Sequence, residues 1–196
     1  MPEISAARGS APPVPLVSIL PASDESLARL RGVPALALEW LPGVPFTAYY
    51  VNGTFGVYPD DPVCHSIAQR HNLESNLVNA GADFAVHGVI VGPDILDNPL
   101  GLDSVRLFGL DVYEASAQHW QDWTITLVAL KHLGIEPVPE IRTWWSFNTT
   151  LDKLKSLASR QYNTGKLSRG LLLRPLRHEQ RDPFYVSVDN PERGTV

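Results

Sequence analysis

Histidine and cysteine side chains have the widest chemical range in this sequence, since they bind metals and act as bases or nucleophiles. The histidines are scattered along the chain: His65, His71, His87, His119, His132 and His178. Only His65 and His71 are close, and a spacing of six residues does not place them on one face of a helix. Cys64 is the one cysteine, which excludes an internal disulfide and a cysteine-based zinc site. We therefore predict no metal centre.

The common catalytic signatures are absent. The sequence contains no phosphate-binding P-loop, no dinucleotide fingerprint, no paired-histidine zinc motif and no serine nucleophile elbow. Serine and cysteine side chains occur, but none has a recognisable base beside it. The sequence therefore predicts no cofactor.

Arg169 and Tyr185 are more suggestive, because both stand in short segments that are typical of strands. Alternation along a strand places Arg169 on the same face as Leu171 and Leu173, a face of mixed polarity. An arginine in a strand usually faces solvent, and an arginine in a pocket binds an anion. The pattern alone leaves both alternatives open.

Several aromatic residues lie at predicted strand ends and turns: Trp40, Tyr49, Tyr50, Tyr58, Trp144 and Trp145. Aromatic side chains in such places commonly pack the core and its rim. The other interpretation is a ligand pocket with aromatic walls.

The elements that must position these residues are short and mixed in type. Asn52-Gly53 between two apolar runs predicts a β-hairpin over residues 46–58. Further strands are expected over residues 16–20, 33–41, 83–91, 104–113, 168–174 and 183–188, and helices over residues 62–80, 118–133 and 150–161. This order predicts an α+β fold with an antiparallel-rich sheet and about three helices.

Size and charge narrow the class of protein. The chain has 196 residues, of which 44% are hydrophobic, and a formal net charge of −5. This predicts one domain over residues 16–196 after a flexible N-terminal segment, residues 1–15. The acidic balance argues against a nucleic-acid partner, and no apolar run is long enough to span a membrane. The single cysteine favours a cytoplasmic location.

Five segments, in order, resemble the adenylyltransferase domain of ATP-dependent RNA ligases of the small ligase-2-like group. They are LALEWLPGVPFTAYYVNGTFGV, VHGVIVGPDILDNP, LFGLDVY, NTTLDKLKSLASRQYNTGKLSRGLLLRP and PFYVSVDNP. The resemblance runs from about residue 34 to residue 190, which is most of the chain. The resemblance implies the nucleotidyltransferase fold of RNA and DNA ligases.

The departures from that family concern the reactive groups. The resemblance places Trp40 at the lysine that would attack ATP, and an indole has no nucleophilic amine. It places Pro42 and Val89 where an aspartate and a glutamate are expected, Arg169 at a metal-binding glutamate, and Tyr185 at a triphosphate-binding lysine. Ligation through a lysyl-AMP intermediate is therefore not expected.

The altered residues imply a rebuilt pocket for a largely apolar small molecule. Its expected lining is Trp40, Glu39, His87, Val89, Leu110, Asp111 and Leu171. Arg169 and Tyr185 are the candidate catalytic residues, one to hold an anion and one to donate a proton or hydrogen bond. Cyclisation, isomerisation or dehydration, as in bacterial-type secondary metabolism, would suit such a site.

Two alternatives stay open at this point. In the first, the domain is a scaffold without a ligand or an activity. In the second, it is a catalytically dead pseudo-ligase that binds a protein or an RNA through its surface. A ligase that uses another lysine is disfavoured, because the candidates lie in helix or loop segments remote from the first motif; they are Lys131, Lys153, Lys155 and Lys166. The oligomeric state is not predicted.

Overall fold

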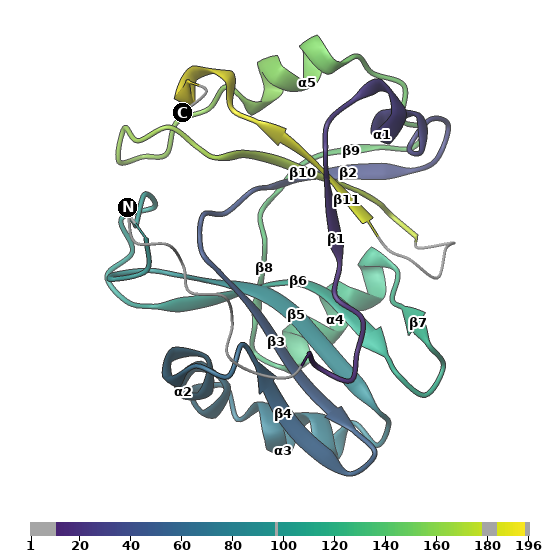
Figure 1. The fold of residues 1–196 in the computed structure, drawn as a ribbon, viewed down its shortest axis with the longest axis vertical. Coiled ribbons are helices and arrows are strands. Elements are labelled where there is room, and N and C mark those ends of the chain that lie inside the picture. The colour runs from purple at the N-terminus through teal and green to yellow at the C-terminus, as the bar shows by residue number, and fades with distance from the viewer. Residues whose placement is uncertain (1–10, 97, 178–183, 195–196) are drawn as a thin grey trace.

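Two β-sheets face each other across an apolar layer, with helices on the outer side of each (Figure 1). The computed structural model describes residues 11–96, 98–177 and 184–194. The order of elements confirms an α+β fold with antiparallel-rich sheets. Five α-helices are present in these ranges, rather than about three.

Sheet A has five strands in the order β1, β11, β10, β2, β9. They are β1 (Ser18–Pro21), β11 (Phe184–Asp189), β10 (Gly170–Pro175), β2 (Ala35–Glu39) and β9 (Glu140–Trp144). All neighbours are antiparallel except β1, which pairs in parallel with β11 at the edge of the sheet. Helices α1 (Asp24–Ala28) and α5 (Leu151–Ala158) cover its outer face (Figure 1).

Sheet B has the order β4, β3, β5, β6, β7, with β8 also paired to β6. Its strands are β4 (Thr54–Tyr58), β3 (Val44–Val51), β5 (Phe84–Val91), β6 (Arg106–Glu114), β7 (His119–Trp120) and β8 (Glu136–Pro137). The predicted hairpin is β3–β4, where Asn52 and Gly53 have φ values of 51° and 76°. Positive φ at both positions matches the twist of the flanking strands, which explains the Asn-Gly pair.

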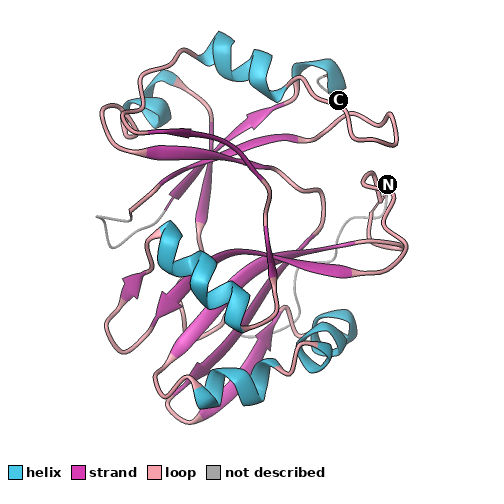
Figure 2. Cartoon of the chain, turned by 180° about the vertical axis from the view of Figure 1, so that it is seen from behind, coloured by secondary structure: helices cyan, strands magenta, loops and turns pink. Residues whose placement is uncertain are grey.

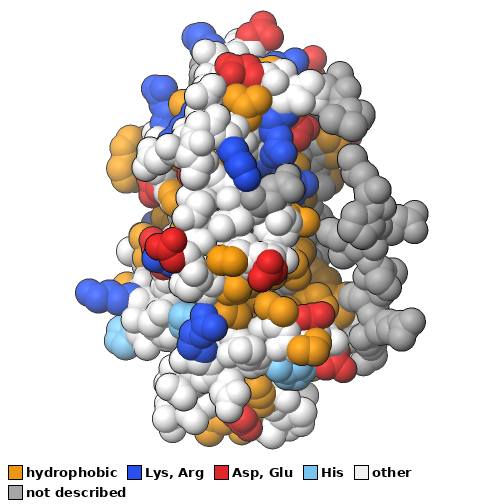
Figure 3. All heavy atoms as spheres, turned by 90° about the vertical axis from the view of Figure 1, so that its left-hand side faces the viewer, with side chains coloured by type: hydrophobic (Ala, Val, Ile, Leu, Met, Phe, Trp, Pro, Cys, Tyr) orange, Lys and Arg blue, Asp and Glu red, His pale blue; other side chains and the backbone are white. Residues whose placement is uncertain are grey.

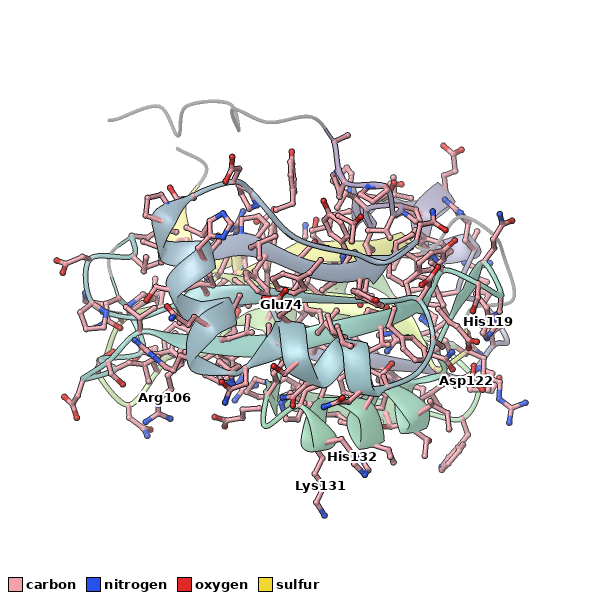
Figure 4. All side chains as sticks on the ribbon, turned by 90° about the horizontal axis from the view of Figure 1, so that it is seen from below. Glu74, Arg106, His119, Asp122, Lys131 and His132 are labelled. Atoms are coloured by element: carbon pink, nitrogen blue, oxygen red, sulfur yellow. The ribbon has the colours of Figure 1, made fainter. Side chains whose placement is uncertain are left out.

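Helices α2 (Pro62–Arg70), α3 (Leu73–Asn79) and α4 (Trp123–His132) pack on sheet B (Figure 2). The predicted helix over residues 62–80 is two helices, because Asn72 has a φ of 51° and breaks the helical path. Asp61 caps α2 by accepting a 2.8 Å hydrogen bond from the Val63 amide. Figure 4 shows α4 from below, with Lys131 and His132 projecting away from it. Among the described helices, none has the length and apolar character needed to cross a membrane.

The N-terminal segment is only partly within the described ranges. Residues 1–10 lie outside them, whereas residues 11–15 are described. Val14 is buried against Val51, Tyr113 and Trp120 of sheet B. Val14 thus supplies an apolar contact between this stretch of the chain and sheet B.

Candidate functional site

Four residues predicted to line a pocket lie together between the two sheets. Trp40 follows β2, Val89 comes from β5, Leu110 from β6 and Tyr185 from β11, and all four belong to one apolar cluster. Phe108, Trp123 and Leu172 belong to the same cluster. The structure thus brings four predicted pocket residues together in the apolar layer between the sheets.

A fully buried ion pair lies beside this cluster. Arg174 of β10 and Asp111 of β6 are both 0% exposed, with Nη2 and Oδ2 3.5 Å apart. The Tyr185 hydroxyl donates to Asp111 Oδ2 at 3.0 Å, and the Thr126 hydroxyl donates to Oδ1 at 3.4 Å. Arg174 also donates to the Gln121 carbonyl at 3.4 Å. Burying charges is costly unless they are paired and hydrogen-bonded, so these contacts maintain the pair.

Tyr185 is therefore engaged inside the protein. Burial raises the pKa of its phenol well above the ordinary value, and the negative charge of Asp111 raises the pKa further, although Arg174 opposes this. The phenol stays protonated and donates to Asp111. Its hydroxyl proton is committed to the network rather than directed at a ligand.

His87 of β5 is the cross-strand neighbour of Asp111. The two residues face each other across β5 and β6, next to a register shift between His87 and Gly88. The imidazole Nδ1 is 3.0 Å from the Thr47 hydroxyl, and its ring centroid lies 4.9 Å from that of Trp120. Burial lowers the pKa of His87 to about 4, and the Asp111 charge only partly offsets this effect. His87 is thus a neutral core residue at pH 7.

This burial predicts acid-sensitive stability. His87 has a pKa of about 4 when folded and about 6.5 when unfolded. The unfolded chain therefore binds the proton preferentially, so stability is complete above pH 6.5 and falls toward pH 4. His87 should account for a loss of about 3 kcal/mol of unfolding free energy between pH 7 and pH 4.

Urea unfolding at both pH values measures this loss. His87→Gln removes the titrating group, so the unfolding free energy of this variant should fall by about 3 kcal/mol less than that of the wild type between pH 7 and pH 4. The control is His65→Gln, because the His65 side chain is 55% exposed. An unchanged pH dependence in His87→Gln would contradict this account of the buried imidazole.

Arg169 lies at the rim of the inter-sheet layer, directly before β10. Its guanidinium carbon stands 3.8 Å from the centroid of the Trp40 ring, which is a cation–π contact. Burial lowers the pKa of Arg169, with Arg193 acting in the same direction and Asp189 raising it. An arginine remains protonated at neutral pH, so the stack places a partly desolvated positive charge at this rim.

A cleft of about 1230 Å³ opens here. Its charged lining residues are Lys155, Lys166, Arg169, Arg193 and Asp189, and its apolar lining includes Pro42, Leu96, Pro99, Leu151 and Leu167. Figure 3 shows the face on the left of Figure 1, with lysine and arginine side chains in its upper half and hydrophobic side chains across its middle. Four cations against one carboxylate make the cleft suited to an anion.

Two predicted pocket residues lie elsewhere. Leu171 points to the outer face of sheet A and packs in the core that includes Leu154 of α5. Glu39 is paired in register with Leu171, and burial raises its pKa while the positive charge of Arg160 lowers it. Strand alternation separates these residues from Tyr185, which faces the inter-sheet layer.

Sequence reasoning missed Arg174. The signal was present, because a charged residue follows three leucines in the strand segment GLLLRP. A charge at a core position of a strand requires a buried partner, and Asp111 supplies it. Within the described ranges, no group of three or more His, Cys, Asp or Glu residues is arranged to hold a metal ion.

Comparison with known proteins rests on structure. No protein-family model and no curated protein matches the sequence. The fold is similar to structures of the Naegleria gruberi RNA ligase. A ligand-free variant has a TM-score of 0.81 and 16% identity, over 95% of this chain and 59% of that chain. A variant with ATP and Mn has a TM-score of 0.75 and 17% identity, over 86% of this chain and 52% of that chain. The ligase with PPi has a TM-score of 0.73 and 17% identity, over 86% of this chain and 53% of that chain.

The chain spans just over half the length of those ligase structures. At such identities the likeness concerns the fold, which agrees with the two facing sheets and their helices. The chain therefore has an RNA ligase-like nucleotidyltransferase fold.

Proposed function

We propose that this chain is a non-adenylylating, ligase-fold domain that binds a small organic anion with an apolar body. The observation that carries the proposal is the stack of Arg169 on Trp40 at the rim of the cleft. In the sequence resemblance, Trp40 stands at the nucleophilic lysine and Arg169 at a metal-binding glutamate. An indole under a guanidinium supports anion binding and offers no group to accept AMP.

The lining of the cleft defines the chemistry of the ligand. Its four cations favour a carboxylate, sulfonate or phosphate ester, since a charge-assisted hydrogen bond is about twice as strong as a neutral one. Its proline and leucine side chains favour an apolar body. The cations and apolar side chains that line the cleft support its rim as the place for this ligand.

Binding is favoured over catalysis. Arg169 lines the cleft, whereas the Tyr185 hydroxyl is buried and donates to Asp111. The two candidate catalytic residues thus do not share an accessible site. Cyclisation, isomerisation or dehydration by this pair would require the hydroxyl to leave Asp111.

Replacing Arg169 by alanine should weaken binding of the anion at least tenfold, because a hydrogen bond to a charged group contributes about 1.5–3 kcal/mol. The measurement is a thermal-shift screen of aromatic and aliphatic carboxylates, sulfonates and phosphate esters, followed by calorimetry of the binders. A ligand at a hundred times its Kd adds about 2.7 kcal/mol of stability.

The matched control is Arg177→Ala, because Arg177 is an exposed arginine paired with Asp122, outside the lining of the cleft. The Arg177→Ala variant should bind the anion with the same affinity as the wild type. Equal affinities in the wild type and Arg169→Ala would refute the proposed site. Binding of RNA instead, with loss at moderate salt, would favour the pseudo-ligase module.

A further inference from the structure

The two walls of the cleft differ in chemistry and come from different halves of the fold. In the described part of the chain, its four cations all belong to the half built on sheet A: Lys155 of α5, Lys166, Arg169 and Arg193. The same half also contributes Asp189 and apolar residues such as Leu151 and Leu167, whereas the described residues of the opposite wall, Pro42, Leu96 and Pro99, border sheet B and are all apolar. We call these the cationic wall and the apolar wall. A ligand that uses both must span the distance between the two halves.

One hydrogen bond joins the walls at the edge of the cleft. The Thr164 hydroxyl donates to the Pro99 carbonyl at 2.6 Å. Thr164 belongs to the loop that carries Lys166, and Pro99 belongs to the apolar wall. The loops also touch, because a Cβ built on Gly101 would lie 2.7 Å from Thr164 Cγ2.

Each loop holds its own shape. The Asn98 side chain donates to the Leu102 carbonyl at 2.9 Å and accepts from the Leu102 amide at 3.0 Å. In the other loop, the Tyr162 amide donates to the Lys166 carbonyl at 2.8 Å. The hydrogen bond between Thr164 and Pro99 therefore ties these two internally bonded loops to each other at the edge of the cleft.

We infer that Thr164 is a positioning residue that fixes the separation of the two walls and thereby selects the length of the ligand. The inference rests on the proposed function and extends it. The selected ligand carries an anionic group at one end, for the cationic wall, and an apolar group at the other, for the apolar wall. Pre-organised walls favour the ligand that spans them without distortion.

A series of ω-phenyl carboxylates, from phenylacetate to phenylhexanoate, tests this inference by calorimetry. The wild type should show an optimum in chain length. Thr164→Val retains the shape of the side chain and loses the hydroxyl, so it should bind the optimal acid about fivefold more weakly and flatten the length dependence. Thr164→Ser retains the hydroxyl and should preserve the optimum.

A second variant tests the spacing directly. Gly101→Cys with Thr164→Cys brings two thiols close together, since a Cβ built on Gly101 would lie 2.7 Å from Thr164 Cγ2, and their oxidation would link the two loops covalently. The oxidised form should sharpen the length optimum, and reduction should reverse this change. Cys64 is buried and does not compete.

The outcomes separate the two proposals. An unchanged length profile in Thr164→Val, with binding still dependent on Arg169, would overturn the role of Thr164 and leave the proposed function standing. Failure of every acid to bind the wild type would overturn the inference and count against the proposed function as well. A flattened profile in Thr164→Val that Thr164→Ser restores would support it.

Discussion

Asp111→Asn is expected to lower the free energy of unfolding by about 3–5 kcal/mol. The amide is nearly the same size as the carboxylate, so the packing is retained and only the charge is lost. Arg174, which is 0% exposed, would then lose the carboxylate charge that lies 3.5 Å from its guanidinium. An uncompensated buried charge costs far more than the loss of an exposed pair, because little solvent reaches it.

Urea unfolding of the variant at pH 7 measures this cost. The control is Asp122→Asn, which removes the partner of Arg177 in an ion pair whose side chains are 76% and 38% exposed. That change should cost no more than about 1 kcal/mol. The double variant Asp111→Leu with Arg174→Met should recover much of the loss, since an apolar pair tolerates burial. Similar losses for Asp111→Asn and Asp122→Asn would contradict the buried pair.

Gly170→Ala is expected to destabilise the fold by about 3 kcal/mol or more. Gly170 has a φ of 143°, and a Cβ at this position would lie 2.0 Å from the Val188 carbonyl oxygen. The backbone there also positions the site, because the Gly170 carbonyl accepts a 3.0 Å hydrogen bond from the Trp40 amide. The substitution should therefore disturb the stack of Trp40 and Arg169 as well.

Gly165→Ala provides the matched comparison. Gly165 also has a positive φ, 78°, but no atom lies within 4 Å of a Cβ built there. Gly165→Ala should therefore lower the free energy of unfolding by only about 1–2 kcal/mol, which is the cost of placing a side chain on a left-handed backbone conformation. Thermal and urea unfolding of both variants, with tryptophan fluorescence as the probe, measure the difference. Equal losses would show that the close approach to Val188 is relieved by a small shift of the strand.

Most strands were predictable from local signals. The Asn52-Gly53 turn fixed the hairpin, and apolar runs located β5 and β6 within two residues. The strand β9 was missed, because its sequence Glu-Ile-Arg-Thr-Trp has weak apolar character. The break at Asn72 was missed because a helical pattern continues on both sides, and only the left-handed conformation of Asn72 reveals it.

The site was predictable only in part. Position in the family-like segments correctly grouped Trp40, Val89, Leu110 and Tyr185. Leu171 was misplaced, since the face of a strand that meets the other sheet depends on register. Of the cationic wall, only Arg169 was predicted to hold an anion, because the other three cations come from separate segments.

The central claim is that the chain binds an anion at its rim and accepts no nucleotide covalently. Intact-protein mass spectrometry after incubation with ATP and Mg²⁺ or Mn²⁺ tests it most directly. The account predicts an unchanged protein mass, since Trp40 has no amine to form a phosphoramide bond with AMP. An adduct of one AMP on any lysine would contradict it and show that adenylylation chemistry persists in this fold.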